Sequence, residues 1–154
     1  MPSSGDPAKG AVRSARHCAR EFALQGLYSW LLAGGDCGEI AKRFQSSPGY
    51  GRADGVYFIE LLQGASASAE ALRAHFASAI DRPLAHLSPI EHAILLIATY
   101  ELAHRPEIPY RVVIDEAVEL AKDFGGSDGY RYVNAVLDKV AVRLRAGEAG
   151  TAEA

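Results

Sequence analysis

The sequence predicts an all-α protein of about seven helices. Every strong hydrophobic periodicity between residues 12 and 145 has helical spacing, and no window shows the alternation of a half-buried strand. Capping residues and glycine or proline stops separate the periodic segments. The chain has 154 residues, of which 49% are hydrophobic and 23% are charged, so it is long enough for one helical domain with its own core.

The longest predicted helix includes residues 13–30, where basic side chains on one face oppose small or apolar side chains on the other. Asp36 and Glu39 have the spacing of a capping pair, which opens a short helix that continues through Phe44. The glycine- and serine-rich segment 46–55 is interpreted as a loop.

Two further helices are predicted after this loop. Asp54 is a candidate N-cap for a strongly apolar segment that begins at Val56 and is expected to break near Gly64. Apolar residues at helical spacing then predict a helix over 69–80, which ends at the sequence Asp-Arg-Pro of residues 81–83.

The second half of the chain is better delimited. Ser88, Pro89 and Glu91 form a capping box with proline at the first helical position. The helix that they open is apolar on most sides, so we expect it to be central. It ends at residues 105–109, where two prolines disfavour helix before them.

Two final helices complete the predicted fold. A helical stripe over residues 113–124 is ended by Gly125 and Gly126. Ser127 or Asp128 is the predicted N-cap of the last helix, whose apolar stripe continues to residue 144.

The ends of the chain differ from the predicted domain of residues 12–145. Residues 1–11 and 146–154 are rich in small residues and have almost nothing to bury, so we expect disordered tails. The N-terminus resembles no secretory signal, and no apolar run approaches the ~20 residues that cross a bilayer. Cys18 and Cys37 are too few for a disulfide framework. We expect a cytoplasmic protein with reduced thiols and no membrane contact.

A basic stripe on the first helix is the strongest functional signal. Arg13, Arg16, His17 and Arg20 are spaced i, i+3, i+4 and i+7, which places them on one helix face. Cations at a helix N-terminus oppose its dipole by up to ~1 kcal/mol. Folding alone would not favour them there, so the stripe predicts an anionic partner, and nucleic acid is the usual one.

Charge is distributed unevenly, although the net charge is only −3. Residues 1–30 contain four basic and two acidic residues, whereas residues 89–130 contain three basic and eight acidic residues. Solvated helix faces are the simpler explanation of the acidic block. The alternative is that the two regions bind partners of opposite charge.

Catalytic motifs are missing from the sequence. It contains no phosphate-binding loop, dinucleotide fingerprint or nucleophile elbow, and its five histidines lack metal-ligand spacing. Asp115 and Glu119 lie one helical turn apart, which is more typical of an exposed face than of an acid–base pair. The sequence therefore predicts a binding protein with no catalytic residue, metal or cofactor.

Three blocks share a recognisable pattern. They run from ARE at 19–21 to LYSW at 27–30, from PIE at 89–91 to YEL at 100–102, and from IPY at 108–110 to VNAVLDK at 133–139. In this order and spacing, which cover roughly residues 13–145, they resemble the NusB family of bacterial transcription antitermination proteins.

The resemblance implies two three-helix groups packed across each other, about 12–80 and 82–145. It also implies that the protein binds single-stranded RNA, the boxA element of ribosomal RNA leaders. It would do so as a heterodimer with NusE, a small-subunit ribosomal protein, within an antitermination complex on RNA polymerase. Members of the family occur as monomers and as homodimers, so a homodimer stays open.

The resemblance also implies which residues make contacts. The RNA candidates that it implies are Arg13, Arg16, Arg20, Tyr28 and Tyr132. His17 is a further RNA candidate, because a neutral imidazole can hydrogen-bond or stack on a base, and a bystander role is its alternative. The NusE candidates are Glu91 and Asp128. For Tyr28 and Tyr132 packing is an alternative role, and for Glu91 and Asp128 helix capping is one. Family members often have consecutive arginines where this chain reads Arg16-His17-Cys18, and this departure is expected to lower RNA affinity.

Two alternative functions remain. One is a helical protein–protein adaptor whose basic helix contacts an acidic protein. The other is an RNA-binding module related to the N-terminal domains of some ribosomal RNA methyltransferases. No methyl-donor domain follows Leu144, so a free-standing module is favoured.

Overall fold

The computed structural model describes residues 7–126 and 128–150, and within these the side chains of 15–126 and 128–148. The described residues form helices and no strand, as predicted. The seven α-helices are α1 (Pro7–Ala33), α2 (Cys37–Gln45), α3 (Gly55–Ala67), α4 (Ala69–Phe76), α5 (Pro89–His104), α6 (Tyr110–Phe124) and α7 (Gly129–Leu144). Short helices η1 (Tyr50–Arg52), η2 (Leu84–His86) and η3 (Ala146–Gly150) complete them.

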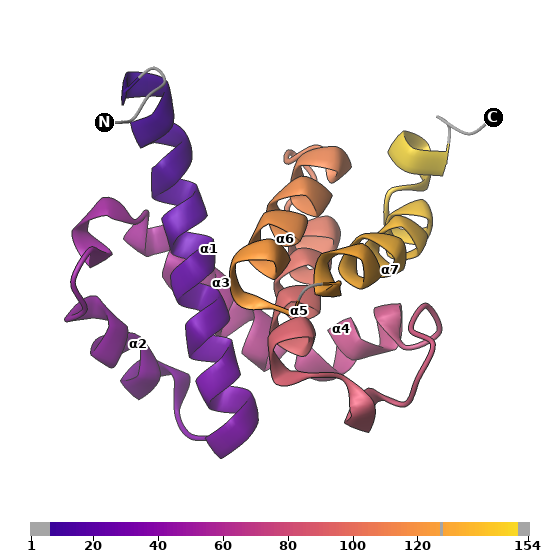
Figure 1. The fold of residues 1–154 in the computed structure, drawn as a ribbon, viewed down its shortest axis with the longest axis horizontal. Coiled ribbons are helices and arrows are strands. Elements are labelled where there is room, and N and C mark those ends of the chain that lie inside the picture. Colours follow the sequence, from indigo (N-terminus) through magenta and orange to yellow (C-terminus); the bar gives the residue numbers. More distant parts are fainter. Residues whose placement is uncertain (1–6, 127, 151–154) are drawn as a thin grey trace.

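The helices form two groups that share one core. Helices α1, α2 and α3 pack together, as do α5, α6 and α7, and α4 lies against α5 and α7 (Figure 1). Helix α5 also packs on α1 and α3, and its buried residues run from Ala93 to Thr99 without interruption. The predicted central helix and the two three-helix groups are therefore confirmed. Helix α4 falls within the first predicted group, about residues 12–80, but lies against the second.

Local sequence signals set the starts of three helices. Asp36 accepts a hydrogen bond from the Glu39 backbone N–H at 3.1 Å, and Ser88 accepts one from the Glu91 N–H at 3.1 Å. Asp54 caps α3 in the same way. These three caps were predicted. Asp128 occupies the N-cap position of α7, but its side chain accepts no cap hydrogen bond within the described part of the chain.

Gly64 does not break α3 as predicted, since the helix continues through it to Ala67. A Cβ on Gly64 would lie 2.5 Å from Cε1 of Tyr100. The missing side chain therefore makes room for the Tyr100 ring, whose hydroxyl donates to Glu60 at 3.0 Å. Close packing between α3 and α5 explains this glycine.

Both predicted tails are partly helical. Helix α1 begins at Pro7, and residues 146–150 form η3. Residues 1–6 and 151–154, where the rest of the tails were predicted, and Ser127, a predicted cap, lie outside the described residues.

The end of α7 is tied to the end of α5. Arg145, which is buried, donates hydrogen bonds to the carbonyls of Glu101 and Leu102 in the last turn of α5 and of Arg105, the residue that follows it. Glu148 pairs with Arg145 and also accepts from the Tyr110 N–H at the start of α6. The bond to Leu102 gives a partner to a carbonyl at the helix C-terminus, whereas the Glu101 and Arg105 carbonyls also accept hydrogen bonds from the backbone N–H groups of Arg105 and Ile108.

Candidate nucleic-acid interface

Arg20 lies inside the protein. Its side chain extends from α1 and only 4% of the residue is exposed. Its Nη2 is 2.9 Å from Oε2 of Glu101 on α5, to which Nε also donates, and its Nη1 is 3.4 Å from Oε1 of Glu116 on α6. Burial alone would lower the pKa of Arg20, but the charge of Glu101, the hydrogen bonds with it and the charges of Tyr57 and Glu116 together raise the pKa.

Tyr57 of α3 lies between the Arg20–Glu101 ion pair and Arg16. Its hydroxyl donates to the Glu101 carboxylate, and burial together with that charge raises the pKa of Tyr57. The Arg16 guanidinium covers the Tyr57 ring at 3.9 Å from its centre. Arg16 is half-buried and forms no ion pair with any described side chain.

His17 lies between carboxylates of two helices. Its Nδ1 is 2.9 Å from Oε1 of Glu116, and its Nε2 is 3.2 Å from Oε2 of Glu21. Burial alone would lower the pKa of His17, but the hydrogen bond with Glu116 and the charges of Glu116 and Glu21 raise it. The imidazole therefore joins α1 to α6.

These contacts correct the expectation of a free basic stripe. Arg20 and His17 are both bound to carboxylates of the same chain, so these two members of the stripe are not free to meet a partner. The dipole argument also fails, because α1 begins at Pro7 and a helix dipole acts within the first turn. Arg13 belongs to α1, but its side chain lies outside the described ones. Among the described side chains of the stripe, Arg16 is the one that forms no ion pair.

Tyr28 lies on an apolar groove between the two helix groups. Tyr28 is 37% exposed. The groove is bounded by α1, α2, the start of α5 and the end of α6, and its lining includes Tyr28, Ser29, Arg43, Phe44, Ile90 and Phe124. Arg43 donates to the Ser29 hydroxyl at 3.1 Å. Two accessible aromatic rings and a guanidinium thus share one surface.

The remaining predicted residues gather at the starts of α5 and α7. A Cβ built on Gly129 would lie 3.2 Å from Oε2 of Glu91. Glu91 is therefore beside Asp128, the exposed residue that precedes Gly129. Tyr132 is half-buried, and exposed Arg82 lies over its ring at 4.3 Å from the centre. Arg82, not the Tyr132 ring, is the more accessible group here.

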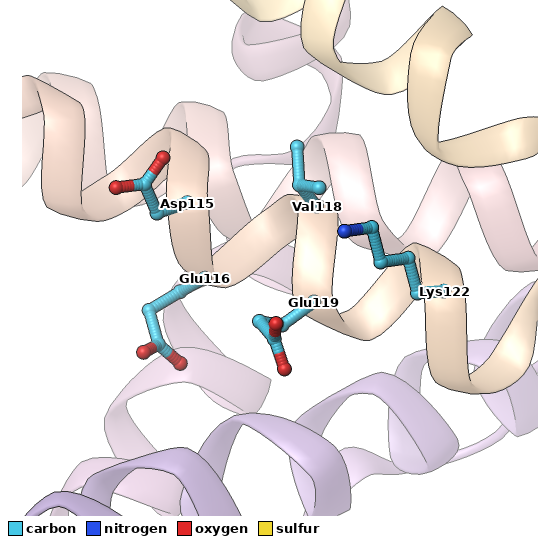
Figure 2. Close-up of a pocket in the computed structure, with 5 residues that line it drawn as sticks. All are labelled: Asp115, Glu116, Val118, Glu119 and Lys122. Carbon is cyan, nitrogen blue, oxygen red and sulfur yellow. The ribbon is translucent and has the colours of Figure 1, made fainter.

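Helix α6 carries the acidic surface that the charge pattern predicted. A shallow hollow there is lined by Asp115, Glu116, Val118, Glu119 and Lys122. Figure 2 shows that Glu116 and Glu119 point toward one side of the helix and Asp115 toward the other. Glu116 forms ion pairs with His17 and Arg20, whereas Asp115 and Glu119 are exposed.

Sequence reasoning missed the partners of the basic stripe. In the sequence Glu101 falls in the acidic block and in the YEL pattern of residues 100–102, and it lies in a helix predicted to be apolar on most sides. A buried carboxylate is normally paired, so this position was a signal that a cation from elsewhere meets it. Arg43 and Phe124 carried no comparable signal, because the groove that they line exists only after the two groups pack.

No helix among the described residues has both the length and the apolarity that a membrane span requires.

Comparison with known sequences finds similarity to NusB proteins along most of the chain. The NusB family profile matches residues 17–142. The chain is 53% identical over 145 residues to the transcription antitermination protein NusB of Bordetella pertussis, covering 92% of this chain and 94% of that protein. It is 52% identical over 144 residues to the NusB protein of Nitrosomonas eutropha, with 92% and 86% covered.

Two solved structures share the fold. One is NusB of T. maritima, with a TM-score of 0.71 and 24% identity over 82% of this chain and 89% of that one. The other is described as antitermination factors NusB and NusE in complex with double-stranded RNA, with a TM-score of 0.73 and 21% identity over 84% of this chain and 98% of that one. The predicted all-α fold is therefore confirmed.

Proposed function

The chain belongs to the NusB family, and from this premise we propose that it is a transcription antitermination protein that binds boxA RNA as a heterodimer with NusE. The observation that carries the proposal is the 53% identity to a transcription antitermination protein over 92% of the chain. The function is one of binding and not of catalysis. In the cell we place it in the cytoplasm, within an antitermination complex on RNA polymerase.

The RNA surface that we propose is smaller than the sequence suggested. Arg16 supplies a guanidinium at the surface, with Arg13 one turn before it on α1. Tyr28 and Phe124 offer rings on which unpaired bases can stack, and Arg43 adds a positive charge beside them. Arg20 and His17 are assigned instead to holding α1 against α5 and α6.

The NusE surface that we propose lies at the start of α5 and α7. Glu91 and Asp128 are adjacent there, and Asp128 is exposed. Carboxylates at a protein surface suit a basic partner such as a ribosomal protein, because complementary charge speeds association and selects the partner. Tyr132 and Arg82 lie at the same end of the molecule and border this surface.

Fluorescence anisotropy with labelled RNA tests the proposal. The arms are single-stranded boxA RNA, a scrambled strand of equal composition and a boxA duplex, each with and without NusE. We expect the chain to prefer single-stranded boxA over the scrambled strand, and NusE to tighten binding. Equal affinity for boxA and scrambled RNA, together with no calorimetric binding of NusE, would contradict it and favour the adaptor alternative.

A further inference from the structure

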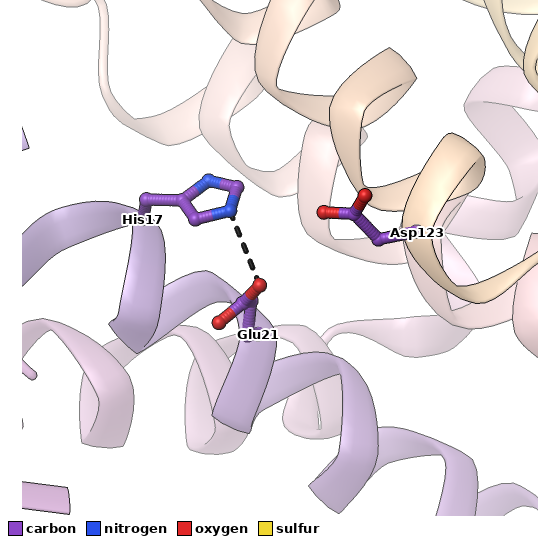
Figure 3. Close-up of side chains that lie close together, drawn as sticks. All are labelled: His17, Glu21 and Asp123. Carbon is purple, nitrogen blue, oxygen red and sulfur yellow. Dashed lines mark ion pairs between the residues drawn. The ribbon is translucent and has the colours of Figure 1, made fainter. Parts of the chain in front are cut away.

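Three potential metal ligands converge between α1 and α6. His17 and Glu21 lie one turn apart on α1, and Asp123 lies in the last turn of α6. One ligand atom from each of the three lies within 4.8 Å of the others. Figure 3 shows the imidazole and the two carboxylates directed toward the same space between the helices.

Glu116 orients the imidazole for this role. The shorter of the two carboxylate contacts, 2.9 Å from Nδ1 to Oε1 of Glu116 against 3.2 Å from Nε2 to Glu21, assigns the proton of the neutral ring to Nδ1, where it forms a hydrogen bond to Glu116. The lone pair is then on Nε2, the nitrogen that faces Glu21. Metal-bound histidines usually have such a carboxylate partner on the second nitrogen, because it fixes the tautomer and strengthens the ligand.

The distances fit a small tetrahedral ion. With metal–ligand bonds of about 2.0–2.1 Å, two ligand atoms of a tetrahedral Zn²⁺ site are roughly 3.3 Å apart. Nε2 of His17 and Oε2 of Glu21 are already 3.2 Å apart. Asp123 is exposed, so its side chain can rotate and bring an oxygen closer.

The local charge also favours a dication. Glu21 and Asp123, together with Glu116, place three carboxylates around one imidazole. Among the described side chains, the cation within ion-pair distance of this group is Arg20, which contacts Glu116 and is shared with buried Glu101. A bound divalent ion would be the largest local charge and would relieve the repulsion between the carboxylates.

We propose that His17, Glu21 and Asp123 form a binding site for a divalent transition-metal ion that clamps α1 to α6. Zn²⁺ is the best match, since a single imidazole with two carboxylates suits a borderline ion better than Mg²⁺ or Ca²⁺, which select oxygen ligands alone. Water completes the coordination. The site was invisible to sequence spacing because Asp123 comes from a distant helix.

Calorimetric titration of the metal-free full chain with Zn²⁺ tests this site, and Mg²⁺ is the comparison ion. The ligand variants are Asp123→Asn and His17→Ala. Asp115→Asn is the matched control, because it makes the same change at another exposed position of α6. Cys18→Ala is included because thiolates also bind Zn²⁺ and Cys18 follows His17. Circular dichroism establishes that each variant is folded, and Asp123→Asn, at an exposed residue, is the variant least prone to unfold.

We expect saturable binding of Zn²⁺ and not of Mg²⁺, with a rise in Tm when Zn²⁺ is present. Asp123→Asn should weaken binding by roughly tenfold or more, because loss of an outer-shell partner alone costs 10–100-fold. Asp115→Asn and Cys18→Ala should bind as the original chain does. No saturable Zn²⁺ binding, binding unchanged in folded Asp123→Asn, or binding lost in Cys18→Ala would each overturn the proposal.

Discussion

Arg20 and Glu101 form a buried ion pair, with Nη2 of the arginine 2.9 Å from Oε2 of the glutamate. The pair joins α1 to α5, and Tyr57 of α3 donates to the same carboxylate. An arginine that looks like part of an RNA-binding stripe is thus part of the core. Replacing Arg20 would therefore lower the stability of the fold, and any loss of ligand binding would follow from that.

Arg20→Ala is expected to lower the free energy of unfolding by about 3–5 kcal/mol, because it leaves the Glu101 charge buried without its cation. The double variant Arg20→Met with Glu101→Gln should recover more than half of that loss, since it removes both charges and keeps an acceptor for Tyr57. Urea denaturation measures both. If the double variant were less stable than the single one, the desolvation argument would be wrong.

Arg16→Ala should reduce RNA affinity while leaving the protein folded. The variant loses the contact with the Tyr57 ring, which contributes only about 0.5–1 kcal/mol at an accessible site. If Arg16 contacts one phosphate of single-stranded boxA RNA, the slope of log K against log salt should fall by about 0.7. Arg52→Ala, another accessible arginine, serves as the control. An unchanged slope would remove Arg16 from the proposed surface.

Gly64→Ala should destabilise the junction of α3 and α5. The new Cβ would overlap the Tyr100 ring, and overpacking of this kind costs about 1–3 kcal/mol. Gly51→Ala is the matched control, because a Cβ there meets nothing within 4 Å. Thermal denaturation of the two variants should show a lower Tm for Gly64→Ala alone. Equal Tm values would mean that the ring moves aside at no cost.

His92 should make stability fall in mild acid. Burial, together with the charge of Arg73, lowers the pKa of His92 to about 4, and Arg73 Nε donates to its Nε2 at 3.0 Å. In the unfolded chain the imidazole has a pKa near 6.5, so the unfolded state binds the proton first as the pH falls. The stability that this residue contributes is lost between about pH 6.5 and pH 4.

A comparison with His92→Gln isolates this effect. Between pH 7 and pH 5 the original chain should lose about 2 kcal/mol more than the variant, measured by urea denaturation at each pH. Other titrating groups, His17 among them, are common to both proteins and cancel. Parallel pH profiles would show that folding does not shift the pKa of His92.

The fold could be read from the sequence because its signals are local. The caps at Asp36, Asp54 and Ser88 act within one helical turn, and each was found where expected. Gly64 was misjudged because its reason is a ring from another helix. The all-α class needed only the periodicity of apolar residues.

The candidate site was harder to predict because its contacts are long-range. Periodicity places Arg16 and Arg20 on the same face of α1, yet one covers a ring at the surface and the other is buried. What separates them is Glu101, which comes from another helix. A helix face is a local property, whereas the choice between solvent and a buried partner depends on packing.

Arg145, which donates a hydrogen bond to the end of α5, is synthesised long after that helix. Its partner in the last turn of α5, the Leu102 carbonyl, is made about forty residues earlier, so this carbonyl waits for its side-chain donor while the nascent chain leaves the ribosome. Any product of interrupted translation that stops before residue 145 would lack that donor, and proteases should degrade it preferentially.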